Sequence, residues 1–188
     1  MHGSTVHKDI ERVLFTEDQI AARVNELGAQ IAADYAEFAD RGEEIELVGL
    51  LRGSMVFMAD LARAIKIPVR MDYMCVSSYG NGAQSSGMVR ITKDLDDSLE
   101  GRHVIIVEDV IDTGLTLKFI GRNLASRKPA SLETAVFLKK NVPGQEPLDC
   151  KYCGFECENE FIVGYGLDYA QRYRNFSEVC VLKPEVYE

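Results

Sequence analysis

A run of four β-branched residues at positions 104–107 (VIIV) constrains the fold of this chain more than any other feature. A segment this apolar is typical of a strand that is buried on both faces of a parallel sheet. A polar segment, 108–112, follows it directly, and the residues after that predict a helix over about 113–127. Because parallel strands need a crossover connection that is usually a helix, this order predicts an α/β protein with a mostly parallel, twisted sheet flanked by helices.

Strand and helix patterns also alternate along the rest of the chain. Thr16 and Gln19 have the spacing of a capping box, which predicts that a helix begins after Thr16. Two segments without apolar periodicity, 77–88 and 141–147, are expected to be loops. We predict helices over 17–39 and about 55–65, and strands over 45–51, 69–76, 89–95, 134–138, 161–165 and 179–182.

The composition is that of one compact domain. The 188 residues are 46% hydrophobic and 27% charged, which is enough apolar material for a core, so we expect a single domain over residues 1–188. The formal net charge of −9 argues against binding to nucleic acid or to an anionic membrane surface. No apolar run is long enough to span a bilayer, and the first ten residues lack the apolar run of a secretory signal. The odd number of cysteines, five, favours the reducing cytoplasm.

Residues 112–116 (DTGLT) have the composition of an anion-binding loop. Gly114 permits close approach of the backbone, Thr113 and Thr116 supply hydroxyl groups, and amides at the start of the next helix point toward a ligand. The Lys-Ser or Lys-Thr pair of a nucleotide triphosphatase P-loop is missing, and no G-x-G-x-x-G sequence is present. Since ligands of open α/β sheets bind at the carboxyl ends of the strands, this loop is the first candidate for a site.

Two acids, Glu108 and Asp109, lie between the buried strand and this loop. Carboxylates accept hydrogen bonds from vicinal hydroxyls and from hydrated metal ions. An anion-binding loop beside acids that bind a diol predicts a site for a ribose 5-phosphate. The alternative is that both acids are solvated turn residues and that Asp112 is only a helix N-cap.

The segment 107–117 (VEDVIDTGLTL) resembles the phosphoribosyl pyrophosphate (PRPP) signature of the type I phosphoribosyltransferases. Within that family the sequence is most similar to the hypoxanthine-guanine phosphoribosyltransferases. Residues 51–54 (LRGS) resemble the family's pyrophosphate loop, 77–79 (SSY) the start of its mobile lid, and 161–169 (FIVGYGLDY) its purine and magnesium segment. The four motifs occur in the family's order. The resemblance implies the type I phosphoribosyltransferase fold, with a small hood formed by the terminal segments.

The activity implied by the resemblance is a step of purine salvage. The phosphoribosyl group of PRPP would be transferred to hypoxanthine or guanine, giving IMP or GMP and pyrophosphate. Asp112 would be the catalytic acid/base near purine N7, and Glu108 and Asp109 would hold the ribose hydroxyls. The residues implied to bind the ribose phosphate of PRPP are Glu108, Asp109, Asp112, Thr113, Gly114, Leu115 and Thr116.

Pyrophosphate is strongly anionic, and a protein this acidic needs added positive charge to bind it. Arg52, Gly53 and Arg174 match the pyrophosphate-binding positions of the family, and we expect a cis peptide bond between Leu51 and Arg52.

Magnesium would supply the remaining positive charge, because Mg²⁺ binds a few carboxylates together with phosphate oxygens and water. The resemblance implies Asp168 and Glu108 as its carboxylates. Considered without the surrounding motif, Asp168 would be a turn acid.

Base recognition is implied to rest on Lys140, with Phe161 stacked on the purine and Ile162 contributing backbone groups. A lysine ammonium has only hydrogen-bond donors, which suits the O6 acceptor of hypoxanthine or guanine and not the amino group of adenine. A register error of one residue would assign this role to Lys139.

Ser78 and Tyr79 would belong to a lid that closes over the site and excludes water. Because relatives pair as dimers or tetramers, we expect a homodimer or homotetramer. Two other functions stay open: a regulatory protein that binds PRPP or nucleotides, and a phosphoribosyltransferase for xanthine or a pyrimidine. The presence of Asp112 and the charge of −9 argue against the first, and Lys140 with Phe161 against the second.

Three cysteines, Cys150, Cys153 and Cys157, have a spacing that suggests zinc. A convincing fourth ligand is lacking nearby, and the segment resembles an edge strand of the family, so we favour a strand without structural zinc. His103, at the start of a buried strand, is expected to be a packing or turn residue.

Overall fold

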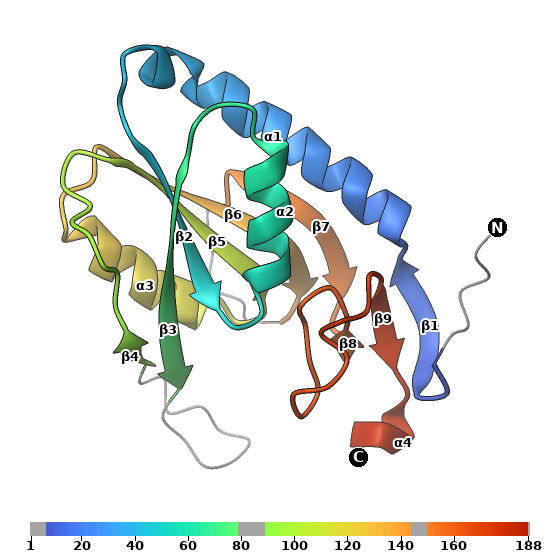
Figure 1. Ribbon diagram of the computed structural model, residues 1–188. Coiled ribbons are helices and arrows are strands. Elements are labelled where there is room, and N and C mark those ends of the chain that lie inside the picture. The colour runs from blue at the N-terminus through green and yellow to red at the C-terminus, as the bar shows by residue number, and fades with distance from the viewer. Residues whose placement is uncertain (1–6, 79–88, 144–149, 188) are drawn as a thin grey trace.

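The computed structural model describes residues 7–78, 89–143 and 150–187, and these form a six-stranded and a three-stranded sheet with flanking helices (Figure 1). The elements follow in the order β1 (Ile10–Phe15), α1 (Glu17–Asp40), β2 (Ile45–Leu51), α2 (Met55–Ala64), β3 (Arg70–Ser78), β4 (Val89–Lys93), β5 (His103–Ile111), α3 (Leu115–Ala125), β6 (Ser131–Asn141), β7 (Tyr152–Glu158), β8 (Ile162–Val163), β9 (Val179–Leu182) and α4 (Pro184–Tyr187). None of the described helices is long and apolar enough to cross a membrane.

The larger sheet has the strand order β4-β3-β2-β5-β6-β7, and its neighbouring strands are parallel except for β3 and β4. The run 104–107 is fully buried in β5, which pairs with β2 on one side and with β6 on the other. The predicted α/β fold with a mostly parallel sheet is therefore confirmed.

Helices cover both faces of this sheet, with α1 and α2 on one face and α3 on the other (Figure 1). Successive residues of β5 face opposite layers, so that Ile105 packs beneath α1 and α2 while Ile106 packs against α3. The predicted capping box starts α1: the Thr16 hydroxyl accepts from the N–H of Gln19, and the Gln19 side chain accepts from the N–H of Thr16.

The smaller sheet joins the two ends of the chain, in the antiparallel order β1-β9-β8. Figure 1 shows it beside the carboxyl ends of β6 and β7, where it forms the predicted hood. The sequence did not predict β1, because its residues do not alternate between apolar and polar. It is ordered by pairing with β9, a segment from the other end of the chain.

Several helices and strands begin or end at other residues than predicted. β5 and β6 extend past the predicted 104–107 and 134–138, since they continue to pair with each other as far as Ile111 and Lys139. α3 begins at residue 115 rather than 113, because Gly114 has φ 80° and lies outside the helix. The strand predicted over 161–165 contains only β8.

Candidate active site

The segment 108–116 lies at the carboxyl ends of the central strands, and the fold brings distant segments to it. A cavity of about 250 Å³ lies between the end of β5, the end of β6 and the hood. Its lining residues are Asp109, Val110, Asp112, Lys140, Phe161, Ile162, Leu167 and Asp168. Six of these eight are site residues predicted from the sequence, namely Asp109, Asp112, Lys140, Phe161, Ile162 and Asp168.

A second cavity, of about 200 Å³, is formed where β5 leads into α3. Gly114 is the N-cap of α3 and has left-handed φ, which favours glycine. Asp112 is therefore not its N-cap, contrary to one alternative considered above, and the hydroxyl oxygen of Thr113 accepts from the N–H of Leu115 at 3.5 Å. The first backbone amides of a helix lack partners within the helix and bind anions readily. The cavity is lined by Glu108, Val110, Ile111, Asp112, Thr113, Gly114, Thr116 and Leu117.

Glu108 and Asp109 belong to β5 rather than to a solvated turn, so the other half of that alternative is also wrong. Oε2 of Glu108 is buried and has no hydrogen-bond partner among the described residues. Burial and the neighbouring Asp109 raise the pKa of Glu108 well above its usual value. Burial also raises the pKa of Asp109 to about 6. Desolvated carboxyl groups of this kind need an incoming hydrogen-bond donor, such as a ribose hydroxyl or a hydrated metal ion.

We expect Asp109→Asn to stabilise the ligand-free protein at neutral pH by on the order of 1–3 kcal/mol, because a raised pKa means that the ionised group destabilises the folded state. At pH values between about 4, where Asp109 ionises in the unfolded chain, and about 6, where it ionises in the folded protein, the folded state binds more protons than the unfolded state. The destabilisation by Asp109 therefore grows from about pH 4 to pH 6 and stays constant at higher pH. Urea unfolding of wild type and variant at about pH 4 and pH 7.5 measures this difference. A difference independent of pH would contradict it, and Asp96→Asn, at an exposed acid, is the control.

The loop after β2 approaches Asp109 so closely that a side chain at position 53 would collide with it. A Cβ atom on Gly53 would lie 1.5 Å from Oδ2 of Asp109. The peptide bond between Leu51 and Arg52 is cis, as expected. The hydroxyl of the buried Ser54 donates to the carbonyl of Leu50 at 2.6 Å. The predicted pyrophosphate loop therefore packs directly against a predicted ribose-binding acid.

The hood packs against the other side of the same loop. Gly166 has φ +97°, and a Cβ atom there would lie 2.3 Å from the carbonyl oxygen of Gly53. Gly166, Gly53 and Asp109 thus form a continuous stack from the hood to the central strand, although they are far apart in the sequence.

Arg52 and Arg174, the two arginines predicted to bind pyrophosphate, converge on the side chain of Gln171. Their guanidinium groups donate to Oε1 of Gln171 at 3.0 and 3.3 Å. Arg174 also pairs with Asp168 at 2.7 Å and donates to the carbonyl of Gly166 at 2.7 Å. Two guanidinium groups held at one amide oxygen suit an anionic ligand such as pyrophosphate. Nothing in the sequence marked Gln171 for this role.

Lys140 and Asp112 meet at the first cavity. Nζ of Lys140 lies 3.4 Å from Oδ1 of Asp112, and the lysine side chain is only 13% exposed. Their strands are parallel neighbours, so the ends of β5 and β6 place these residues side by side. Lys139, the alternative considered above, does not line this cavity. The structure thus pairs the predicted purine-reading residue with the predicted acid/base.

Phe161 is held in the same cavity by two other aromatic rings. Tyr187 of α4 stacks on it with ring centres 4.5 Å apart, and Tyr169 meets it edge-on at 5.4 Å. Ile162, in β8, is buried. The C-terminal helix therefore orients the ring that is predicted to stack on a purine.

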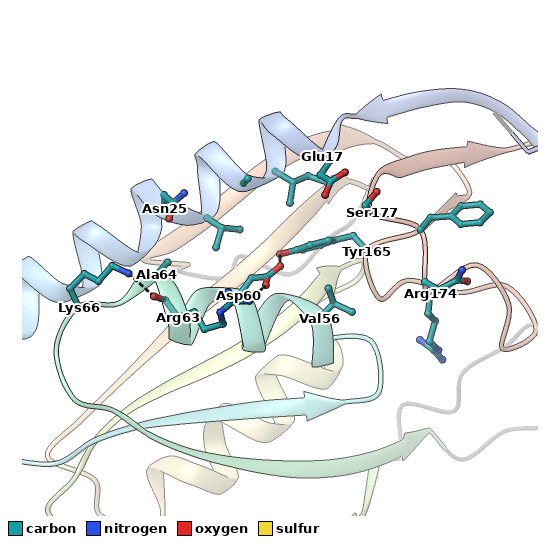
Figure 2. A pocket seen from close by; sticks show the side chains of 15 residues that line it. Glu17, Asn25, Val56, Asp60, Arg63, Ala64, Lys66, Tyr165, Arg174 and Ser177 are labelled. Atoms are coloured by element: carbon teal, nitrogen blue, oxygen red, sulfur yellow. Dashed lines mark hydrogen bonds and ion pairs between the residues drawn. The ribbon is translucent and has the colours of Figure 1, made fainter. Parts of the chain in front are cut away.

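A larger cavity, of about 810 Å³, lies apart from the predicted catalytic residues, between α1, α2 and the hood segment 165–177 (Figure 2). The hydroxyl of Tyr165 donates to Asp60 at 2.9 Å within it. Arg174 contributes to its wall, but Figure 2 shows the guanidinium group pointing away from Asp60 and Tyr165. We therefore assign the site to the carboxyl ends of the strands, where the acids, the amides and the arginines meet.

The carboxylates near the first cavity fit a magnesium ion that arrives with its substrate. Among the described residues no group of three or more His, Cys, Asp or Glu side chains could hold a metal alone. Asp168 lies near Asp109, whose pKa it raises, whereas Glu108 lines the neighbouring cavity. Asp168 and Asp109 thus line one cavity and Glu108 the neighbouring one, and the joint role of Asp168 and Glu108 that the resemblance implies stays a prediction. Because Mg²⁺ commonly uses one or two carboxylates together with phosphate oxygens, this donor set suits it.

Two predictions concern residues away from these cavities. Ser78 is the last residue of β3, and Tyr79 with the rest of the predicted lid lies outside the described residues. His103 is buried at the start of β5, with its ring nitrogens 2.8 Å from Oγ of Ser131 and 3.0 Å from a carboxylate oxygen of Glu43. The prediction of a packing role for His103 is confirmed.

Comparison with known proteins shows the family of the chain. A model of the phosphoribosyl transferase domain matches residues 14–170. The chain belongs to the phosphoribosyltransferase family. It is 49% identical over 181 residues to a hypoxanthine-guanine phosphoribosyltransferase of Mycobacterium tuberculosis, which covers 96% of this chain and 90% of that protein. A protein of the same name from Bacillus subtilis is 45% identical over 180 residues, 96% of this chain and 97% of the relative.

A solved structure extends this similarity to the fold of the phosphoribosyltransferase. The crystal structure of a hypoxanthine phosphoribosyltransferase from Staphylococcus aureus has a TM-score of 0.89 and 44% sequence identity, and the match covers 100% of both chains. The chain is therefore an enzyme of the hypoxanthine-guanine phosphoribosyltransferase group.

Proposed function

We propose that this phosphoribosyltransferase acts in purine salvage and transfers the phosphoribosyl group of PRPP to hypoxanthine or guanine in a magnesium-dependent reaction. The observation that carries the proposal is the pair of cavities on either side of the end of β5. One offers helix amides and a buried carboxyl oxygen of Glu108 that has no hydrogen-bond partner among the described residues, which suits a ribose phosphate. The other offers an aromatic ring and a lysine, which suits a purine.

In the proposed reaction the amides and hydroxyls of 113–116 bind the 5-phosphate, and Glu108 and Asp109 accept hydrogen bonds from the ribose hydroxyls. Arg52 and Arg174 face the departing pyrophosphate. The ribosyl carbon becomes cationic as this group leaves, as at other glycosyl centres, and the adjacent carboxylates stabilise that charge. Asp112, at the edge of the purine cavity, exchanges a proton with N7 of the base as N9 forms its new bond.

We expect Lys140→Ala to weaken the binding of hypoxanthine, because the mutation removes the ammonium group that would donate to O6 of the base. It should also reduce discrimination against adenine by roughly 10- to 10²-fold, because the amino group of adenine would no longer face another hydrogen-bond donor. Competition between hypoxanthine and adenine under steady-state conditions measures the ratio of their kcat/KM values. Lys139→Ala, at the neighbouring position outside the cavity, is the matched control. Unchanged discrimination in Lys140→Ala would refute the assignment.

Magnesium bound with pyrophosphate would neutralise part of the charge on the leaving group. Asp109, Asp112 and Asp168 line the purine cavity and Glu108 lines the neighbouring one; of these, Asp168 and Glu108 are the carboxylates that the resemblance implies for the metal. We expect removal of Mg²⁺ with a chelator to abolish turnover and its addition to restore it. Asp168→Asn should raise the Mg²⁺ concentration needed for half-maximal activity, whereas Asp60→Asn, in the separate larger cavity, should not. Turnover in metal-free buffer would contradict this part of the proposal.

The decisive test of the function is to mix the protein with PRPP and Mg²⁺, to offer hypoxanthine, guanine, xanthine, adenine and uracil separately, and to measure nucleoside monophosphate and pyrophosphate. Hypoxanthine and guanine should react, with adenine and uracil far slower. Binding of PRPP without turnover of any base would instead favour a regulatory protein. Preferential turnover of uracil or adenine would overturn the base assignment.

A further inference from the structure

A tight turn in the hood, at residues 170 and 171, has a backbone conformation that its own residues do not favour. Tyr169 and Arg172 form an isolated antiparallel bridge and exchange two backbone hydrogen bonds, of 3.3 and 2.9 Å. Between them, Ala170 and Gln171 have φ of 49° and 64°, the left-handed values of a type I′ turn. Asn, Asp and Gly predominate in such turns, because other side chains are strained there. The turn therefore needs contacts with the rest of the molecule to hold it.

Gln171 makes such contacts with both its backbone and its side chain. Its N–H donates to Oδ2 of Asp168 at 2.8 Å. Oε1 of its side chain accepts from Arg52 at 3.0 Å and from Arg174 at 3.3 Å. Strained residues that the surrounding structure holds in place are concentrated at ligand-binding sites. Gln171 thus connects three residues that are predicted to bind pyrophosphate or its metal ion.

The amide oxygen of Gln171 joins two separate parts of the site. Arg52 follows β2 in the predicted pyrophosphate loop, whereas Arg174 belongs to the hood segment 165–177. An amide oxygen has two lone pairs, so it can accept from both guanidinium groups at once. It adds no negative charge that would repel an anionic ligand. Arginine side chains have many rotamers, and fixing two of them in advance lowers the entropic cost of binding.

We propose that Gln171 is a positioning residue that holds Arg52 and Arg174 in the orientation that binds pyrophosphate, both within PRPP and as the released product. The inference rests on the proposed function, which makes pyrophosphate the anion bound at these arginines. Gln171 is not among the residues that line the purine cavity, so its effect should be confined to the binding of pyrophosphate and PRPP. Loss of its side-chain oxygen should raise the KM for PRPP and leave the KM for hypoxanthine unchanged.

Two variants of Gln171 remove the acceptor and differ in their effect on the backbone. Gln171→Met keeps the length of the side chain and the strain at φ 64°, whereas Gln171→Gly relieves that strain. Both should raise the Kd for pyrophosphate, measured by calorimetry in the presence of Mg²⁺, roughly tenfold, because the two arginines lose their fixed orientation. Gln171→Gly should nevertheless unfold at a higher urea concentration than Gln171→Met.

Ala170→Gly is the matched control, because it relieves the same kind of strain at the neighbouring position and leaves Gln171 in place. It should be more stable than the wild type and should bind pyrophosphate with the affinity of the wild type. Wild-type affinity in Gln171→Met, or a Kd that follows the stability of the variants, would overturn the role of Gln171. A wild-type protein that binds pyrophosphate and turns over no purine would refute the proposed function instead, and the Kd values of the variants would still decide the positioning role.

Discussion

Asp112→Asn should lower turnover roughly 10²- to 10⁴-fold, because it keeps the shape of the side chain and removes the group that exchanges a proton with the purine. The affinity for PRPP should change little, since the 5-phosphate is bound mainly by the amides and hydroxyls of residues 113–116. Asp112 lies at the edge of the purine cavity, 3.4 Å from Nζ of Lys140. A loss of this size with PRPP binding retained would assign a chemical rather than a binding role to this carboxylate.

The measurement that separates these roles is kcat as a function of pH together with PRPP binding by calorimetry. The variant should have a lower kcat than the wild type at every pH, with PRPP binding retained. Asp96→Asn, at an exposed acid distant in sequence from the site, is the control for removing one negative charge. Wild-type turnover across the pH range in Asp112→Asn would refute the role of Asp112.

Gly53→Ala should reduce kcat/KM for PRPP roughly 10²-fold or more, because an added Cβ atom would lie 1.5 Å from a carboxylate oxygen of Asp109. Either the pyrophosphate loop or the carboxylate has to move, and both belong to the site. The hood packs against the loop, since a Cβ atom on Gly166 would lie 2.3 Å from the carbonyl oxygen of Gly53. One methyl group should therefore disturb several parts of the site.

The control for this prediction is Gly121→Ala in α3, where nothing lies within 4 Å of the added Cβ atom. That variant should keep its activity and be slightly more stable, by about 0.5–1 kcal/mol, because alanine favours a helix over glycine. The double variant Gly53→Ala/Asp109→Ala removes the opposing oxygen, so it should recover stability but not activity. Normal kinetics in Gly53→Ala would show that the loop tolerates a side chain at this position.

The phosphate-binding part of the site could be predicted from the sequence because it is local. Residues 108–116 are contiguous, and the amides, hydroxyls and glycine that bind an anion follow from a strand that leads into a helix. The fold class was predictable for a related reason. An apolar run such as 104–107 indicates that a strand is buried on both faces, and this can be predicted without knowing which helices cover those faces.

The hood could not be predicted from patterns among neighbouring residues. β1 has no clean alternation and is ordered by β9, a strand near the other end of the chain. The stacking of Tyr187 on Phe161 and the hydrogen bond from Arg52 to Gln171 are likewise contacts between separate segments of the chain. Such contacts produce no periodic pattern in the sequence. The type of one residue does not specify its partner, because many residues of the same chemical type could make the same contact.

The sequence alone therefore determined the alternation of strands and helices in the large sheet, the anion-binding loop and the identity of the acids, because these depend on near neighbours in the chain. Only the tertiary structure decided that Glu108 and Asp109 are desolvated, that Asp168 and Asp109 line one cavity, and that Gly53 has no room for a side chain. These properties depend on the distance between atoms from separate strands, and that distance is determined by the packing of the whole sheet and its hood.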